Sequence, residues 1–385
     1  MPALRLTRLT LTQFRNYPAL TWRPRARLVA VFGPNGSGKT NLLEAISLLM
    51  PGRGLRGARL AELPRRGPGA DGHWAVAGRF AAPGGAVDIG TGTPPEGPLD
   101  RRVFRLDGAA PRSQAELAAR VAAVWLTPQM DRMFLQGASA RRRFLDRLVW
   151  ALEPAHVGEL AAHDRAVAER NRLLAHAGAD PAWLAGLEDA IARHAVAVAA
   201  ARRNLVDQLN RALAAGAAGP FPPARLALPC PIAERLATAP AAAVEDWLRD
   251  ALAAARKHDR AAGATSLGAH RADLALADAV TGTAAAAAST GEQKALLVGV
   301  VLGHAALLAE ARGWAPLLLL DEPAVHLDAA RRAALFAALA EGPAQAILTG
   351  TDRDIFAPLA DLAEGLQTGG DSLMPDPGFR APESA

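Results

Sequence analysis

Gly33-Pro34-Asn35-Gly36-Ser37-Gly38-Lys39-Thr40 is the stretch of sequence that decides the fold. It matches G-x-x-x-x-G-K-[ST] at every fixed position, and it lies between an apolar run, 28–32, and a segment with apolar residues at helical spacing, 38–50. A strand, a glycine-rich loop and a helix in this order form a phosphate-binding loop, because the loop N–H groups and the helix N-terminus face one anion. In such a loop Lys39 reaches the β- and γ-phosphates and the Thr40 hydroxyl ligates Mg²⁺. We therefore predict that residues 33–40 bind ATP with Mg²⁺.

A pair of carboxylates follows a second apolar run. Leu317-Leu318-Leu319-Leu320 predicts a buried strand, and Asp321 and Glu322 follow at its carboxyl end, where ligands bind in open α/β sheets. We predict that Asp321 holds the Mg²⁺ shell and that Glu322 orients or deprotonates the attacking water. The alternative is a strand that ends in a solvated acidic turn.

Ser289-Thr290-Gly291-Glu292-Gln293 opens an apolar helical segment shortly before these carboxylates. By itself it is a capping box, with Ser289 as N-cap and Glu292 three residues later. Because it lies between a phosphate loop and an acidic strand end, it resembles the signature motif of ABC-type ATPases. The resemblance implies that Ser289, Gly291 and Gln293 contact the γ-phosphate held by a second subunit, in an ATP-dependent head-to-head dimer.

Three weaker features accompany these motifs. Leu327-Asp328 resembles the D-loop of ABC-type ATPases, although an ordinary Asp N-cap explains it equally well. Gln129 is a candidate for the glutamine that senses the metal, and its alternative is a surface glutamine. Thr349-Gly350-Thr351-Asp352 stands where transporters of this class place a switch histidine, which suggests slow or differently gated hydrolysis.

The organisation of the chain predicts an α/β fold, an ABC-type P-loop ATPase head with an inserted helical second domain. We expect the first part of the ATPase lobe in 1–111, a helical domain with a short antiparallel arm in 112–262, and the second part of the lobe in 263–370. The arm is predicted from apolar residues at near-heptad spacing between Leu184 and Leu213. A flexible tail, 371–385, completes the chain.

Composition limits the class of protein. Cys230 is the only cysteine, so an internal disulfide is excluded and a cytoplasmic location is expected. The apolar run 295–309 is shorter than a bilayer span, which predicts a buried helix and no membrane anchor. The formal charge of +5 comes almost entirely from arginine. Arginine favours bidentate phosphate contacts and so permits a nucleic-acid partner, although codon bias explains the arginine content as well.

Four further segments, together with the spacing of the motifs, resemble the RecF family of ABC-type ATPases. Residues 40–288 separate Lys39 from Ser289, and this insert is longer than in transporter subunits and shorter than in chromosome-structuring ATPases. The four segments are Phe14-Arg15-Asn16-Tyr17, Thr40-Asn41-Leu42-Leu43-Glu44-Ala45, Arg141-Arg142-Arg143-Phe144-Leu145-Asp146 and Gly268-Ala269-His270-Arg271-Ala272-Asp273. Ala269, Ala272 and Glu322 depart from the family pattern. The first two put the role of the 268–273 loop in doubt, whereas Glu322 favours hydrolysis.

The resemblance implies a DNA-binding protein of recombinational repair and replication restart. Such proteins bind ATP, dimerise and engage single-stranded, gapped or junction DNA, and with RecO and RecR they help to load RecA. A weak DNA-dependent ATPase is expected. Two arginine groups are candidate DNA-facing surfaces: Arg141–Arg143, which could equally be a solvated helical face, and Arg53, Arg56, Arg59, Arg65 and Arg66.

Three alternatives remain open at this point. A transporter ATPase subunit would depend on a membrane partner rather than on DNA. A nuclease attached to an ABC head would need Mg²⁺-dependent cutting. A pure interaction module would bind ATP without hydrolysing it.

Overall fold

The computed structural model describes residues 1–176, 178 and 180–380. Its internal contacts divide the chain into two compact units, which we call the nucleotide unit and the helical unit. The nucleotide unit comprises Met1–Asp131, Gly216–Pro222 and Ser289–Ala385, and the helical unit comprises Arg132–Ala215 and Pro223–Ala288. Each is therefore assembled from segments that are distant in the sequence.

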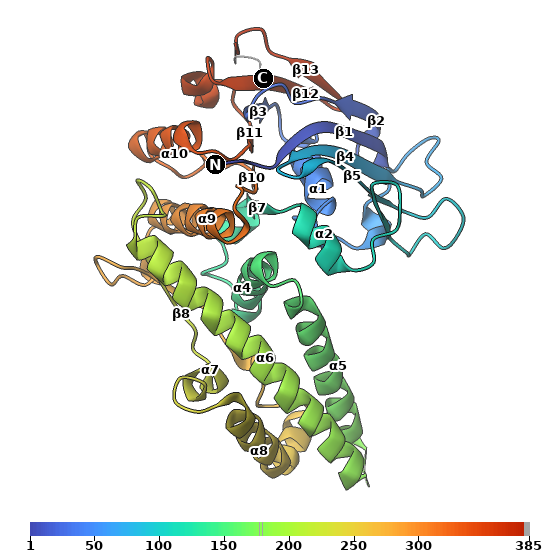
Figure 1. Cartoon of the computed structure of the whole chain (residues 1–385), viewed down its shortest axis with the longest axis vertical. Coiled ribbons are helices and arrows are strands. Elements are labelled where there is room, and N and C mark those ends of the chain that lie inside the picture. Colours follow the sequence, from blue (N-terminus) through green and yellow to red (C-terminus); the bar gives the residue numbers. More distant parts are fainter. Residues whose placement is uncertain (177, 179, 381–385) are drawn as a thin grey trace. The chain divides into compact units, whose positions relative to one another are not determined.

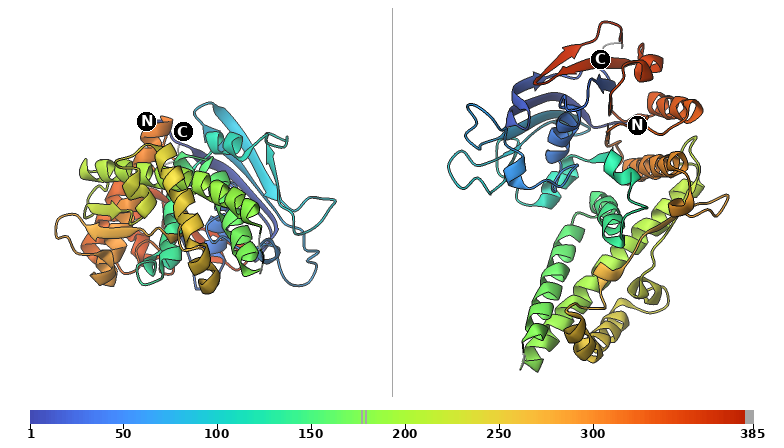
Figure 2. Two further views of the ribbon diagram at one scale, coloured as in Figure 1. Left: turned by 90° about the horizontal axis from the view of Figure 1, so that it is seen from below. Right: turned by 180° about the vertical axis from the view of Figure 1, so that it is seen from behind.

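A six-stranded sheet forms the centre of the nucleotide unit, in the order β13-β12-β3-β11-β10-β7. All neighbours are parallel except β13, which is antiparallel to β12 at one edge. Strands from both ends of the chain meet here, blue β3 beside red β12 (Figures 1 and 2). Its strands are β3 Leu28–Phe32, β7 Ala123–Leu126, β10 Leu317–Leu320, β11 Ala346–Gly350, β12 Ala363–Gly369 and β13 Ser372–Pro375.

The parallel strands consist of runs of buried, mostly apolar residues. Every residue of β3, β7, β10 and β11 is buried, as expected for strands covered on both faces. The helices and short 3₁₀ segments of this unit are α1 Lys39–Leu48, η1 Leu60–Glu62, α2 Gln114–Arg120, α3 Pro128–Asp131, α9 Thr290–Arg312, α10 Ala329–Glu341 and η4 Asp354–Leu359. The predictions of a buried strand at 28–32, a helix from 38 and a strand at 317–320 are confirmed.

A second, antiparallel sheet belongs to the same unit, in the order β2-β1-β4-β5-β6. Its strands are β1 Arg5–Phe14, β2 Tyr17–Trp22, β4 Ala75–Ala82, β5 Gly85–Gly92 and β6 Val103–Leu106. Burial alternates along β4, so that Val76 and Phe80 lie on the buried face and Arg79 lies with small alanines on the exposed face. The region 51–111 therefore supplies three of the five strands of this sheet, β4, β5 and β6.

Helix α9 is the predicted apolar helix. Among the described residues, it is the one helix with the length and hydropathy to cross a membrane, but 78% of its apolar window is buried inside the structure. Its burial is that of a core helix, as predicted.

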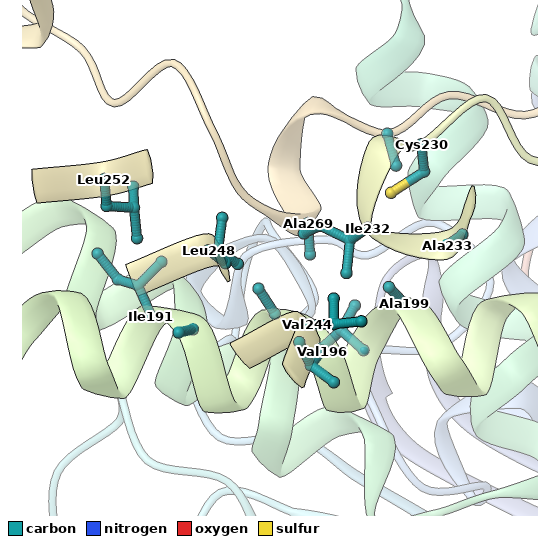
Figure 3. Packing of buried hydrophobic residues seen from close by; sticks show 14 of the residues in the cluster. Ile191, Val196, Ala199, Cys230, Ile232, Ala233, Val244, Leu248, Leu252 and Ala269 are labelled. Atoms are coloured by element: carbon teal, nitrogen blue, oxygen red, sulfur yellow. The ribbon is translucent and has the colours of Figure 1, made fainter. Parts of the chain in front are cut away.

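The helical unit is built around α6, which runs beside α5 (Figures 1 and 2). Its elements are α4 Ala138–Leu152, α5 His156–Ala175, α6 Pro181–Ala214, β8 Ala224–Ala227, α7 Pro231–Arg235, α8 Ala241–Ala262, η2 Ala269–Arg271, β9 Ala275–Asp278 and η3 Ala285–Ala287. Asp180 caps α6, and Pro181 occupies its first turn. The core between α6 and α8 includes Ile191, Val196, Leu248 and Leu252 (Figure 3).

The division of the chain differs from the sequence-based boundaries. Residues 112–131 belong to the nucleotide unit, because β7 joins the parallel sheet. Residues 263–288 belong to the helical unit, because β9 pairs with β8 rather than with the nucleotide-binding sheet. In the predicted tail, Ser372–Pro375 forms β13 and Arg353 pairs with Asp376, while 381–385 lie outside the described residues.

Candidate functional site

The predicted phosphate loop and acidic pair lie at one edge of the parallel sheet. Register pairs Phe32 at the end of β3 with Gly350 of β11, and Leu320 at the end of β10 with Leu348 of β11. The phosphate loop and Asp321 therefore emerge on either side of β11. This is the carboxyl edge of the sheet, where open α/β folds bind ligands.

Backbone conformation and close packing require glycine in the phosphate loop. Gly33, Gly36 and Gly38 all have positive φ, a conformation that L side chains rarely adopt. A Cβ at Gly33 would overlap the Thr368 hydroxyl, and one at Gly38 would lie 2.8 Å from the Tyr17 hydroxyl. The loop is thus both curled by its glycines and packed against β2 and β12.

Lys39 is buried, and its ammonium group donates hydrogen bonds to loop carbonyls. The Nζ–O distances are 2.7 Å to Gly33 and 2.9 Å to Pro34. Burial lowers the pKa of Lys39, while the negative charges of Glu322 and Asp321 act in the opposite direction. Lys39 therefore lies inside the loop and within the electrostatic field of both predicted carboxylates.

A hydroxyl and carboxylate network joins the two motifs. The Thr40 hydroxyl donates to Asp321 Oδ1 at 3.0 Å, and the Thr349 hydroxyl donates to the same oxygen at 2.7 Å. The Glu322 backbone N–H in turn donates to Thr349 Oγ1 at 3.1 Å. Glu322 has φ 50°, so it is held in a strained left-handed conformation at the end of β10. Thr349 thereby fixes the start of the acidic turn.

These donors fit Mg²⁺. Thr40 and Asp321 present hard oxygen atoms beside each other, and Mg²⁺ in nucleotide sites uses one or two protein oxygens together with phosphates and water. The residues that the structure describes contain no group of three or more His, Cys, Asp or Glu side chains suited to a metal. Thr40 and Asp321 thus supply the small number of protein oxygens that a metal bound together with a nucleotide uses.

Two asparagines support the loop from the strand side. Asn41 Nδ2 donates to Asn16 Oδ1 at 2.7 Å, and Asn16 Nδ2 donates to the Gly370 carbonyl. The Tyr17 hydroxyl donates to the Gly38 carbonyl at 3.1 Å, and burial raises the pKa of Tyr17 to about 12, so the phenol stays neutral. The sequence identified 14–17 as a family segment but assigned it no role. Its place beside the phosphate loop supplies one.

The predicted signature begins α9. Ser289 and Glu292 form a reciprocal capping box, with Ser289 N to Glu292 Oε2 at 2.8 Å and Glu292 N to Ser289 Oγ at 3.4 Å. Ser289 is exposed and Gln293 is buried. A Cβ at Gly291 would lie 3.0 Å from the His326 carbonyl oxygen, so this helix start packs closely against the loop that follows β10.

Two of the weaker candidates have a clear local setting. Asp328 caps α10, with its carboxylate accepting a hydrogen bond from Arg331 N at 2.8 Å, so the N-cap reading is confirmed. Gln129 is exposed on α3, just after β7. Register places the end of β7 beside the end of β10, and Asp321 N donates to Leu126 O at 2.9 Å. Gln129 therefore follows a strand end that adjoins the acidic pair.

The segments 141–146 and 268–273 bind one another within the helical unit. Arg141 forms two hydrogen bonds with the Asp273 carboxylate, at 2.7 and 2.8 Å. Arg142 donates to the Ala272 carbonyl at 2.8 Å. Arg202 binds the Asp146 carboxylate through two further bonds, at 2.7 and 2.8 Å. These side chains hold the 268–273 loop in place, which gives Arg141 and Arg142 an internal role.

The second arginine group, in residues 53–66, contains both arginines with hydrogen bonds inside the chain and exposed arginines. Arg56 binds Asn41 at 2.8 Å and lies 3.4 Å from the buried Glu44 carboxylate. Arg65 donates to the Pro68 carbonyl at 2.9 Å. Arg53, Arg59 and Arg66 are exposed.

Curated relatives that align over nearly the whole chain share one name. The chain is 48% identical over 373 residues to the DNA replication and repair protein RecF of Mesorhizobium japonicum, covering 95% of this chain and 97% of that one. It is 47% identical over 378 residues to the protein of the same name from Caulobacter sp., covering 94% and 96%. Residues 28–210 also match a family model described as "AAA domain, putative AbiEii toxin, Type IV TA system".

Solved structures give the same fold. A structure of the recombination mediator protein RecF-ATPrS in the RecFOR pathway matches with a TM-score of 0.84 at 21% identity, covering 97% of this chain and 98% of that one. A RecF-ATP structure matches with a TM-score of 0.80 at 20% identity, covering 98% and 100%. An SMC head bound to the C-winged helix domain of ScpA matches with a TM-score of 0.53 at 17% identity, covering 96% of each chain. The fold is therefore that of an ABC-type ATPase head.

Proposed function

The chain belongs to the RecF family, and we propose that it is an ATP-binding protein of DNA replication and repair that uses ATP to assemble on damaged DNA. The observation that carries this proposal is the network of Lys39, Thr40, Asp321, Glu322 and Thr349 at the carboxyl edge of the sheet. The RecF-ATP structures of similar fold support ATP as the nucleotide.

Each group of the network has a proposed task. The N–H groups of residues 33–40 and the Lys39 ammonium bind the phosphates, which then replace the Gly33 and Pro34 carbonyls as partners of Lys39. Thr40 and Asp321 hold Mg²⁺, which neutralises charge on the phosphates when it is bound. Glu322, held in place by Thr349, orients or deprotonates the attacking water. Gln129 is proposed as the residue that senses the metal.

The exposed start of α9 supports an ATP-dependent homodimer. We propose that Ser289, Gly291 and Gln293 of one copy contact the nucleotide in the phosphate loop of a second copy, with Asp328 nearby as the D-loop residue. A helix N-terminus with an exposed N-cap suits the γ-phosphate. The proposed enzyme is a weak DNA-dependent ATPase, with Thr349 standing where transporters have a switch histidine.

The proposed substrate is single-stranded, gapped or junction DNA, and the proposed partners are RecO and RecR, which act with this family in loading RecA. Arg53, Arg59 and Arg66 are the proposed phosphate-binding arginines, because they are exposed. The structure with RecF-ATPrS, named for the RecFOR pathway, supports the choice of partners. A cytoplasmic location follows from this proposal.

Fluorescence anisotropy of a labelled gapped DNA tests the proposal, with a duplex of the same length as control. We expect binding that needs ATP and Mg²⁺, prefers the gapped DNA, and weakens steeply as salt increases because phosphate contacts dominate. Binding that is unaffected by ATP would contradict the proposed use of the nucleotide.

A further inference from the structure

A buried ion pair joins the start of α9 to the segment that carries Gln129. Lys294 follows the signature directly, and its Nζ lies 2.9 Å from both carboxylate oxygens of Asp131. The Lys294 side chain is 0% exposed and that of Asp131 is 17% exposed. Asp131 is the last residue of α3, two residues after Gln129. The pair therefore ties two segments that are 163 positions apart in the sequence.

Stability alone is a poor explanation for such a pair. The desolvation of two charges offsets much of their attraction, and apolar residues of similar volume often replace a buried ion pair without loss of stability. Separating the two charges, by contrast, leaves each one buried without its counter-charge. The ion pair therefore keeps the end of α3 and the start of α9 together, even though it contributes little to the free energy of unfolding.

The loop after β10 packs against the start of α9. His326 has φ 68°, and its carbonyl oxygen is the atom that a Cβ at Gly291 would approach to 3.0 Å. Three segments therefore converge: the end of α3, the start of α9 and the turn between Glu322 and Asp328.

We propose that Asp131 and Lys294 are positioning residues that make the start of α9 move together with the Gln129 segment. They thereby couple nucleotide binding in one subunit to dimerisation. This inference rests on the proposed function, in which Gln129 responds to the subunit's own nucleotide and the start of α9 contacts the partner's nucleotide. Because the buried charges stay together, a shift of α3 displaces Gly291 and Ser289 as well. Nucleotide binding to the phosphate loop of one subunit thereby increases the affinity of that subunit for a second copy.

The test separates coupling from folding by removing both charges together. The double variant D131L/K294M replaces the pair with apolar side chains, and D131K/K294D restores a pair in reversed order. D131N alone leaves Lys294 buried without its counter-charge. R353M is a control that removes a more exposed ion pair, with Asp376, elsewhere in the nucleotide unit. For each variant we would measure the thermal midpoint, the affinity for a fluorescent ATP analogue, and the ATP concentration at which sedimentation velocity detects dimers.

For D131L/K294M we expect a near-unchanged thermal midpoint and nucleotide affinity, but dimerisation that requires about tenfold more ATP, within the usual range of coupling between sites. D131K/K294D should recover part of that loss, and R353M should behave as the natural chain. Dimerisation of D131L/K294M at the natural ATP concentration would overturn the coupling, as would an equal loss of nucleotide affinity and thermal stability. A natural chain that never dimerises with ATP would instead contradict the proposed function itself.

Discussion

Replacing Thr349 by Val removes one hydroxyl from the nucleotide site and leaves the shape of the side chain nearly unchanged. The hydroxyl donates to Asp321 at 2.7 Å and accepts from the Glu322 N–H at 3.1 Å, and Thr349 is completely buried. A hydrogen bond to a charged group contributes about 1.5–3 kcal/mol, and a buried N–H without a partner costs about 1–3 kcal/mol. Because such terms are not additive, we expect a loss of about 2–4 kcal/mol in the free energy of unfolding.

For a unit of this size each kcal/mol corresponds to about 2–4 °C in thermal midpoint, so the midpoint of T349V should be roughly 4–16 °C lower. The same change frees the acidic turn, and loss of a residue that orients metal ligands typically lowers activity about 10–100-fold. We therefore expect a fall in kcat of that order, measured by phosphate release at saturating ATP.

Thr91 supplies the matched control. Its buried hydroxyl also makes one donated and one accepted hydrogen bond, to the Val103 carbonyl at 2.9 Å and from Arg102 at 2.8 Å, within the antiparallel sheet. T91V should lower the thermal midpoint without a comparable fall in kcat. If T349V retains the natural kcat, or if both variants lose activity in proportion to stability, the proposed role of Thr349 is refuted.

Three further variants test other parts of the account. K39A should abolish binding of a fluorescent ATP analogue and ATP-dependent DNA binding, since it removes the ammonium from the phosphate loop; retained turnover would sink this assignment. E322Q should bind ATP but release little phosphate, and it should stay on DNA as a dimer in gel filtration, whereas normal turnover would exclude Glu322 as the base. For Asp146, burial by itself would raise the pKa, but hydrogen bonds from His156 and Arg202 outweigh it and hold the pKa below the ordinary value. A carboxylate of this kind stabilises the fold above its unfolded pKa of about 3.9, and the stabilisation disappears as the pH falls through the folded pKa. D146N should therefore lose about 3–5 kcal/mol of unfolding free energy at pH 7, because Arg202 is left buried and unpaired. The difference from the natural chain should shrink below pH 4 in denaturant titrations, and a pH-independent difference would exclude the ion pair as its cause.

Local patterns identified the residues at the centre of the candidate site. The phosphate loop has fixed residues at fixed spacing, and the four leucines before Asp321 form a short apolar run of the length of a buried strand. Both features are encoded within about ten residues, so no knowledge of the tertiary fold is needed to identify them.

Contacts between distant residues were not predictable in this way. Thr349 was noted only because a histidine is absent there, and its bonds to Asp321 and Glu322 depend on β11 lying beside β10. The Ser37 and Thr368 hydroxyls, 2.5 Å apart, are 331 positions apart in the sequence. A single polar residue on a strand has no local signature that reveals such a partner.

Pairing between strands also limited the prediction of the fold. β5 is rich in glycine, which weakens its strand signal, yet it pairs with β4 along its whole length. β9 is recognisable as a strand, but its sequence does not reveal that it pairs with β8 in the helical unit. Strand identity is partly local, whereas the choice of partner is set by tertiary packing.

Sedimentation velocity of E322Q with and without ATP and Mg²⁺ tests the central claim most directly, because this variant should retain nucleotide without turnover. The account predicts one copy without nucleotide, two copies with ATP and Mg²⁺, and no dimer when Lys39 is also replaced by Ala. A sedimentation coefficient that does not change on adding ATP and Mg²⁺, at a concentration that saturates a fluorescent ATP analogue, would contradict it.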